Sequence, residues 1–256
     1  MSKRLVALGD SFTEGVGDDD PRAANGVRGW ADRVAAQLAA EVPDFRYANL
    51  AIRGRLLGQV LDEQLEPALA MTPDLVTLYA GGNDLMRPKV DIDALLGRYA
   101  EAVATLRATG ATVVLFTGVD GVEDPLFRKM RGRTAIYNEL VRGIAASHGA
   151  LLVDMWPMRQ LRDRRMWSAD RLHLNSAGHT EVAIEVLRVL DAPHSLSPVD
   201  LAPVPATDPR SRRSEDLRWA REHALPWIKR RVRGESSGDT VTPKRPEPLP
   251  VVDGLA

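Results

Sequence analysis

The most informative segment of the chain is LVALGDSFTEG, residues 5–15. It begins with a continuous apolar run, which is typical of a strand covered on both faces, and it turns polar at Gly9, Asp10 and Ser11. A serine at this point lies at the carboxyl end of a strand, where open α/β sheets bind their ligands. The tripeptide alone is equally compatible with Ser11 as the cap of a following helix.

Apolar runs of the same kind recur along the chain, with helical patterns between them. Strands are predicted at Arg4–Leu8, Tyr47–Ile52, Leu75–Ala80, Thr112–Thr117 and Leu151–Met155. Helices are predicted at Trp30–Ala40, Leu56–Ala70, Ile92–Ala108, Thr134–Ser147 and Ser176–Leu190. Five successive β–α units imply a parallel sheet with right-handed crossovers and helices on both faces. The sequence therefore predicts one three-layer α/β domain over residues 1–192.

The composition changes after this domain, because ten of the 17 prolines lie between Pro193 and the end of the sequence. Residues 193–233 are predicted to form a proline-rich linker and then a basic amphipathic helix over 214–232. This helix carries tryptophans beside its positive charge, so it could make peripheral contact with a membrane or bind a partner, although such a helix more often docks on its own domain. Residues 234–256, rich in proline, glycine and serine, are predicted to be a disordered tail.

The bulk properties exclude several classes of function. The formal net charge of −1 gives no reason to expect nucleic acid as a partner. The absence of cysteine excludes disulfides, thiol catalysis and cysteine-bound metals. The first apolar run is too short for the core of a signal peptide, and no stretch has the length of a membrane span, so a cytoplasmic location is expected. No metal or other cofactor is expected, and the sequence does not determine the oligomeric state.

Catalysis by a serine requires a base and a group that orients the base. Among the five histidines, His173 stands apart because it lies in a polar loop, SADRLHLN at residues 168–175, directly before the last predicted helix. Asp170 precedes it by three residues, so its carboxylate can fold back onto Nδ1 of the imidazole and leave Nε2 for a serine. The same loop is equally compatible with a surface histidine beside a helix cap.

Donors for an oxyanion are predicted after the second and third strands. Gly54 lets a backbone N–H approach a ligand without a side chain in the way. Asn83, in the sequence GGND at residues 81–84, supplies an amide that donates hydrogen bonds without adding charge. Taken alone, this second motif is more simply a tight turn followed by a helix cap.

The four motifs occur in the order Ser, Gly, Asn and Asp-x-x-His, each at the end of a different predicted strand. With them the sequence resembles the SGNH hydrolases, also called GDSL-type esterases and lipases, over about residues 3–190. The resemblance implies a flavodoxin-like sheet of five parallel strands in the order 2-1-3-4-5. It implies that Ser11 is the nucleophile, His173 the base and Asp170 the residue that orients this base. The N–H groups of Ser11 and Gly54 and the side chain of Asn83 would form the oxyanion hole.

The activity that the resemblance implies is hydrolysis of a small-molecule or lipid-like acyl ester through an acyl-enzyme on Ser11, without a cofactor. An acyltransferase or a thioesterase would use the same residues, and a binding module without turnover is the remaining alternative. Phe12 stands where the family has leucine. It is expected to pack beneath the nucleophile without loss of activity.

Two long loops beside the predicted site, residues 120–133 and 156–169, are rich in arginine. They suggest an ester that carries a negative group, although arginines at a surface are more often simply solvated. Substrate contacts are predicted for Phe12, Arg164, Arg165 and Trp167.

Overall fold

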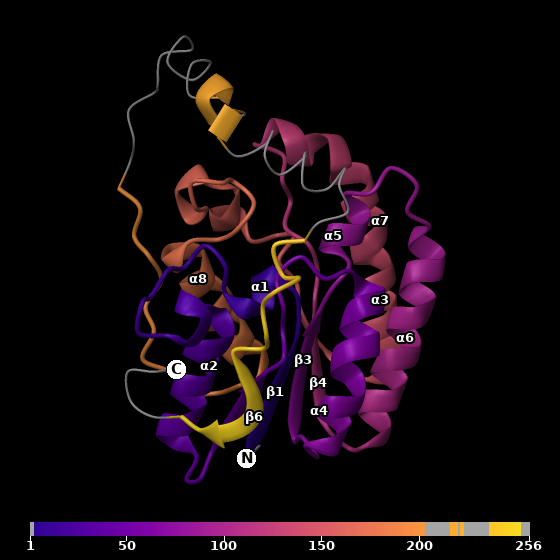
Figure 1. Ribbon diagram of the computed structural model, residues 1–256, viewed down its shortest axis with the longest axis vertical. Helices are drawn as coiled ribbons and strands as arrows, with labels where there is room; N and C mark the ends of the chain where they lie inside the picture. Colours follow the sequence, from indigo (N-terminus) through magenta and orange to yellow (C-terminus); the bar gives the residue numbers. More distant parts are fainter. Residues whose placement is uncertain (1–2, 203–215, 220, 223–235, 252–256) are drawn as a thin grey trace.

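The centre of the computed structural model, which describes residues 3–202, 216–219, 221–222 and 236–251, is a six-stranded sheet. Figure 1 shows helices on both faces of this sheet. The strand order is β5-β4-β3-β1-β2-β6. Strands β1–β5 are parallel, which confirms the predicted order 2-1-3-4-5, and β6 is antiparallel to β2 at the edge. The strands are β1 (Arg4–Gly9), β2 (Arg46–Asn49), β3 (Leu75–Tyr79), β4 (Thr112–Phe116), β5 (Leu151–Val153) and β6 (Arg245–Pro250).

The residues of β1 alternate between two hydrophobic cores. Val6 and Leu8 belong to the core on one face of the sheet, and Leu5 and Ala7 belong to the core on the other. All four side chains are buried. A central strand with a core on each face needs apolar residues at every position, which explains the unbroken apolar run at the start of the chain.

Helices of the two outer layers complete these cores. One core includes α2 (Trp30–Glu41) and α8 (Ser176–Val189), which lie on the left in Figure 1. The other includes α3 (Leu57–Val60), α4 (Glu66–Ala70), α6 (Ile92–Ala108) and α7 (Pro125–His148), on the right. The remaining helices are short: α1 (Ser11–Glu14), α5 (Gly82–Leu85), the π-helical η2 (Leu61–Leu65), and the 3₁₀ turns η1 (Ala24–Gly26), η3 (Arg159–Arg162) and η4 (Arg164–Met166).

The helix predicted over Leu56–Ala70 is interrupted by the π-helical turn η2. The side chain of Gln64, in this turn, is buried against the end of β1. It accepts a hydrogen bond from the N–H of Gly9 and donates one to the C=O of the same residue, both at 2.9 Å. A π turn of this kind is often found at functional sites, and here it fixes the backbone directly before Asp10 and Ser11.

Helix α7 begins at Pro125, well before its predicted start at Thr134. Proline is favourable at the first helical position because no hydrogen bond is lost there. The carboxylate of Asp124 accepts a hydrogen bond from the N–H of Phe127 at 3.3 Å, as a helix cap does. Most of the predicted loop 120–133 is therefore helical.

The predicted disorder of residues 234–256 is wrong for the part that the structure describes, residues 236–251. Residues Arg245–Pro250 form β6, which pairs with β2. Its three prolines are tolerated because β6 lies at the edge of the sheet, where no further strand needs their missing N–H groups. The helix predicted over 214–232 falls mostly outside the described residues, but residues 216–219 are helical. None of the helices in the described ranges is long and apolar enough to cross a lipid bilayer.

Candidate active site

Ser11 is the first residue of α1, and only Asp10 separates it from β1. The carboxylate of Asp10 caps this helix by accepting a hydrogen bond from the N–H of Phe12 at 3.1 Å. The ring of Phe12 packs against aromatic side chains, with its centroid 4.7 Å from that of Tyr79 and 5.5 Å from that of Trp30. The serine is thereby placed at the carboxyl end of the central strand, on a firmly packed support.

Asp170 and His173 lie in the loop between η4 and α8. Oδ2 of Asp170 is 2.7 Å from Nδ1 of His173, and Oδ1 accepts hydrogen bonds from the Ser168 hydroxyl and the N–H of Leu172. Burial opposes the charge on Asp170, but the hydrogen bonds and the charge of His173 outweigh it and lower the pKa of this carboxyl. The carboxylate is therefore ionised at neutral pH, and it holds the imidazole by Nδ1 so that Nε2 is directed away from it.

The serine segment and the histidine loop meet at Gly17. A Cβ added to Gly17 would collide with the carbonyl oxygen of Leu174 and would also crowd Cβ of His173. Its backbone has a left-handed φ of 98°, which only glycine adopts readily. Glycine is therefore required at the point where the chain after α1 passes the catalytic histidine candidate.

Gly54 lies in the turn after β2, with a left-handed φ of 78°. The neighbouring Arg53 donates its backbone N–H to Oε2 of Glu14 at 2.7 Å, and its guanidinium group binds the same carboxylate. Glu14 is buried and belongs to α1, so the helix that begins with Ser11 also holds the Gly54 turn. Within the described part of the chain, no protein acceptor is paired with the N–H of Ser11 or of Gly54.

Asn83 lies in α5, which follows β3. Its Nδ2 donates hydrogen bonds to Oδ2 of Asp10 at 3.2 Å and to the C=O of Arg55 at 3.1 Å. The amide is therefore oriented between the residue before Ser11 and the residue after Gly54. The three oxyanion donors predicted from the sequence thus come from three segments that contact one another.

The carboxyl group of Asp10 is buried in this arrangement. Burial raises its pKa to about 7, although the N–H of Phe12, the charge of His173 and the amide of Asn83 favour the ionised form. Nearby Asp84 opposes ionisation further. The charge next to Ser11 therefore changes near neutral pH.

A cavity of about 170 Å³ opens beside these residues, and Ser11, Asn83 and His173 all line it. Phe12 and Trp167, two of the predicted substrate contacts, line it as well. Most of the remaining wall is apolar, and it includes Leu85, Met86, Phe127, Met130 and Leu172. Among the described residues, no group of three or more histidine, aspartate or glutamate side chains is placed to hold a metal ion.

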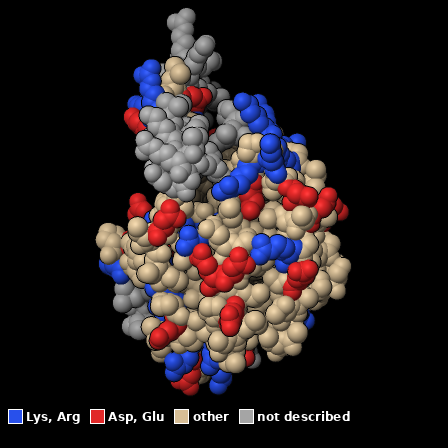
Figure 2. All heavy atoms as spheres, turned by 45° about the vertical axis from the view of Figure 1, so that its right-hand side comes forward, with Lys and Arg blue, Asp and Glu red and all other residues tan. Residues whose placement is uncertain are grey.

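Arg164 and Arg165, the other two predicted substrate contacts, are not among the residues that line this cavity. Arg164 donates to the C=O of Ser168 at 3.1 Å. Arg165 binds both carboxylate oxygens of Asp163 and also the C=O of Ala202. These guanidinium groups therefore stabilise their own loop. Figure 2 shows Lys and Arg gathered near the top of one face, with acidic and basic side chains intermixed below them.

A contact that no sequence pattern predicts joins residues 216–219 to the Asp170–His173 loop. The indole N–H of Trp219 donates a hydrogen bond to the C=O of Asp170 at 2.9 Å. Arg171 has a left-handed φ of 60°, and its guanidinium lies 4.8 Å from the Trp219 ring centroid. The same guanidinium pairs with Asp216 at 2.5 Å. A segment outside the predicted domain therefore holds the loop of the candidate base.

The sequence model of the GDSL-like lipase/acylhydrolase family matches residues 7–180. The chain belongs to this family. The matched region contains every motif that carries the resemblance, from Ser11 to His173. Membership makes the protein a hydrolase of carboxylic esters.

Solved structures share the architecture of this GDSL-family protein. TesA is 26% identical with a TM-score of 0.59, and the match covers 73% of this chain and 97% of TesA. LAE5, an α/β hydrolase enzyme from the metagenome of Lake Arreo in Spain, is 26% identical with a TM-score of 0.61, over 75% of this chain and 97% of LAE5. Axe2, an acetylxylan esterase from Geobacillus stearothermophilus, has a similar fold at 23% identity and a TM-score of 0.62, over 73% of this chain and 94% of Axe2. No curated protein sequence matches the chain significantly.

Proposed function

We propose that this GDSL-family protein hydrolyses carboxylic esters through an acyl-enzyme on Ser11. The observation that carries the proposal is the 2.7 Å contact between Asp170 and Nδ1 of His173, on a cavity that Ser11 also lines. A serine hydroxyl is a weak nucleophile until a base removes its proton. An oriented imidazole beside a serine at a helix start supplies this base.

The proposed reaction has two halves that use the same groups. Nε2 of His173 takes the proton of the Ser11 hydroxyl while Oγ attacks the acyl carbon. The tetrahedral intermediate collapses when His173 passes the proton to the departing alcohol, and the ester C–O bond breaks. Water then attacks the acyl-enzyme, with His173 again as the base, and releases the acid. Asp170 stabilises the imidazolium form through Nδ1 without taking the proton itself.

The negative charge on the acyl oxygen is stabilised by the N–H groups of Ser11 and Gly54 and by the amide of Asn83. Support for the backbone donors comes from their freedom from protein acceptors among the described residues. The amide of Asn83 contributes by redirecting one of its hydrogen bonds, which run to Asp10 and Arg55. Loss of one such donor typically lowers the rate by roughly 100- to 1000-fold.

The cavity wall supports an apolar acyl group. Each methylene group moved from water into such a wall contributes about 0.8 kcal/mol. We therefore expect kcat/KM to rise with the length of the acyl chain until the cavity is full, and to fall beyond that length.

Hydrolysis of p-nitrophenyl esters from acetate to decanoate tests this function. The wild type should show a chain-length optimum, Ser11→Ala should lose the activity, and Ser195→Ala, at an exposed serine far along the chain, should retain it. Equal activity in the Ser11→Ala variant would refute the acyl-enzyme. Thioesters of the same acyl groups test whether the site is also a thioesterase. Addition of alcohol acceptors to the ester assay tests whether it transfers the acyl group.

A further inference from the structure

Residues 236–250 form a segment that we call the C-terminal strap. It begins beside the Gly54 turn and runs along the edge of the sheet, ending in β6, and it is drawn in yellow in Figure 1. The family model ends at residue 180, so the strap lies outside the region that defines the family. The family model therefore does not account for its contacts with the site.

The strap touches the Gly54 turn directly. A Cβ added to Gly54 would collide with Oγ of Ser236, which occupies the space above this glycine. Gly238 is buried, and a Cβ added there would collide with the carbonyl oxygen of Arg53. The strap backbone thus packs against the peptide that carries the Gly54 N–H. A movement of the strap toward Arg53 at Gly238 would therefore displace this peptide, and a movement away would remove its support.

The strap also reaches Asn83 through Arg55. Asp239 pairs with Nη1 of Arg55 at 3.6 Å, while Glu63 of η2 pairs with Nε of the same side chain at 2.8 Å. The C=O of Arg55 accepts one hydrogen bond of the Asn83 amide at 3.1 Å. The two oxyanion donors other than Ser11 are therefore both adjacent to strap contacts.

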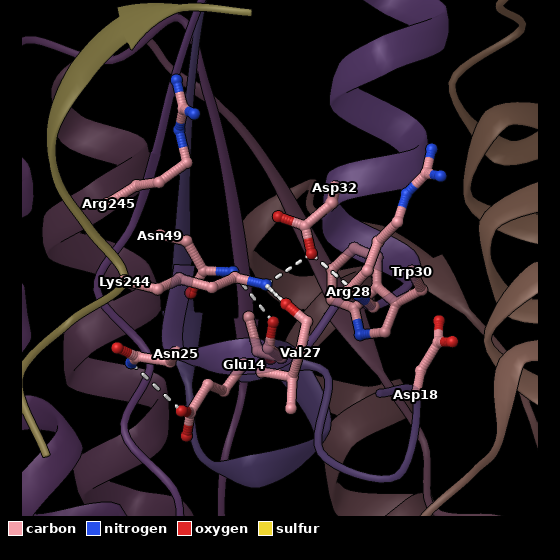
Figure 3. A network of polar contacts seen from close by, with 12 residues as sticks. Glu14, Asp18, Asn25, Val27, Arg28, Trp30, Asp32, Asn49, Lys244 and Arg245 are labelled. Carbon is pink, nitrogen blue, oxygen red and sulfur yellow. Dashed lines mark hydrogen bonds and ion pairs between the residues drawn. The ribbon is translucent and has the colours of Figure 1, made fainter. Parts of the chain in front are cut away.

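Lys244 anchors the strap in the body of the domain. Its side chain is only 2% exposed, and Nζ lies 2.5 Å from Oδ2 of Asp32 in α2. Nζ also donates to the C=O of Val27 at 3.3 Å. Figure 3 shows this lysine extending from the strap to Asp32. A buried ion pair is lost only at a large cost, so the anchor fixes where the strap lies.

A second contact joins the strap to α1. Nδ2 of Asn25 donates to the C=O of Thr242 at 2.9 Å and to Oε1 of Glu14 at 3.3 Å. Glu14 is the same carboxylate that holds the backbone of Arg53. The side chain of Asn25 lies beside Glu14 in Figure 3. The strap, the helix of Ser11 and the Gly54 turn are therefore linked by one set of polar contacts.

We infer that the C-terminal strap is a positioning element of the active site, which holds the N–H of Gly54 and the amide of Asn83 where the oxyanion forms. Ser236, Gly238 and Asp239 act on the Gly54–Arg55 turn, and Lys244 keeps the strap in place. This inference rests on the proposed function. A donor displaced by about 1 Å can cost on the order of 100-fold in rate, so a small shift of the strap is sufficient to matter.

Two changes in the full-length chain move the strap by different means. Gly238→Ala pushes it away from Arg53 and leaves Lys244 anchored. Lys244→Met with Asp32→Asn removes the anchor without leaving a buried charge unpaired, whereas Lys244→Met alone leaves Asp32 unpaired and destabilises the fold. Gly132→Ala, where an added Cβ meets no atom within 4 Å, is the matched glycine control. Glu247→Ala, at an exposed position of β6, is the strap control.

The measurements are kcat and KM for a p-nitrophenyl ester, the rate of inactivation by a p-nitrophenyl alkylphosphonate, and Tm. In Gly238→Ala and in the double variant we expect kcat to fall at least about tenfold, with KM within threefold of wild type and inactivation slowed in parallel. Tm should stay close to that of the controls in Gly238→Ala. It should fall in the double variant, because Asp32→Asn also weakens the hydrogen bonds that Asp32 accepts from the N–H of Gly29 and the hydroxyl of Tyr47. A tetrahedral phosphonate needs the same donors, so a purely structural role would not produce this pattern.

A kcat equal to that of wild type in both Gly238→Ala and the double variant would overturn the inference. A loss of kcat that is confined to Lys244→Met and accompanies a lower Tm would overturn it as well. In either case hydrolysis that depends on Ser11 would leave the proposed function intact. A wild-type protein without esterase activity would instead refute the proposed function, and the positioning role with it.

Discussion

The side chain of Gln64 binds both the N–H and the C=O of Gly9, each at 2.9 Å. Gly9 is the last residue of β1 and lies two positions before Ser11. In Gln64→Ala the N–H of Gly9 loses this partner, whereas its C=O still accepts the N–H of Ile52 at 3.3 Å. A buried polar group without a partner costs about 1–3 kcal/mol. We expect the free energy of unfolding to fall by roughly 1–3 kcal/mol and kcat to fall as well, because the support of Ser11 loosens.

Urea unfolding and ester hydrolysis measure these two effects. The control is Gln59→Ala, since Gln59 is exposed and accepts a single hydrogen bond, from the N–H of Leu56 at 3.0 Å. Equal stability of the two variants would show that the paired hydrogen bonds of Gln64 contribute nothing beyond a surface contact.

Asp10 makes the stability of the protein depend on pH. Its pKa is raised to about 7 in the folded protein, chiefly by burial, so between pH 4 and 7 the folded state holds a proton that the unfolded state has released. This contribution to stability is complete below pH 4 and is lost as the pH rises to 7. The side chain introduced by Asp10→Asn does not titrate, so this pH dependence is absent from the variant. The unfolding free energy of the variant should therefore rise relative to that of wild type between pH 4 and 8, by an amount of order 4 kcal/mol at most.

Chemical unfolding of both proteins at a series of pH values measures this difference. Asp19→Asn, at an exposed aspartate of the following loop, is the control and should leave the pH profile unchanged. Parallel profiles for wild type and Asp10→Asn would show that Asp10 ionises in the folded protein as it does in the unfolded chain.

His179 makes the stability of the protein depend on pH in the opposite direction to Asp10. It is buried, its Nδ1 accepts a hydrogen bond from the N–H of Trp30 at 3.2 Å, and burial together with the charge of Arg33 lowers its pKa to about 3. The unfolded chain therefore takes up a proton below about pH 6.5 that the folded protein refuses, and stability is lost as the pH falls from 6.5 towards 3. His179→Asn keeps an acceptor for Trp30 and does not titrate. The unfolding free energy of this variant should fall less steeply than that of wild type as the pH is lowered from 6.5. Equal slopes for the two proteins would contradict a lowered pKa of His179 in the folded state.

Much of the fold follows from the sequence because its signals are local. A strand with a core on each face needs apolar residues throughout, and runs such as Leu5–Leu8 show it directly. The start of α7 was predicted too late, at Thr134, although Asp124 and Pro125 form a helix-start signal. The strand β6 carries no such local signal. Its prolines resemble those of a disordered tail, and only pairing with the edge of β2 makes them compatible with a strand.

Some residues of the candidate site can likewise be predicted from local sequence patterns, and others cannot. Each catalytic or oxyanion-hole candidate lies in a short motif that the sequence shows directly. The motifs of Ser11, Gly54 and Asn83 follow a strand, and that of Asp170 and His173 directly precedes α8. Lys244 and Asp32 are not visible, because their contact joins positions 212 residues apart and no pattern links them. For Arg164 and Arg165, composition does not show that carboxylate and carbonyl oxygens nearby bind their guanidinium groups.

Trp219 offers a last test of how the region after the domain acts on the site. Its indole N–H binds the C=O of Asp170, and its ring lies beside Arg171, which keeps a left-handed backbone between Asp170 and His173. Such a backbone costs energy in a residue other than glycine, so it persists only where contacts hold it. Trp219→Phe keeps a ring but removes the N–H.

We expect this variant to lower kcat by about two- to tenfold with little change in KM, because a net hydrogen bond of about 1 kcal/mol no longer orients the loop. The unfolding free energy should change by a similar small amount. Leu217→Ala, at a side chain that is 57% exposed in the same helical segment, is the control and should retain full activity. Steady-state kinetics with one p-nitrophenyl ester suffice. If Trp219→Phe and Leu217→Ala have the same kcat, the indole hydrogen bond does not position Asp170 or His173.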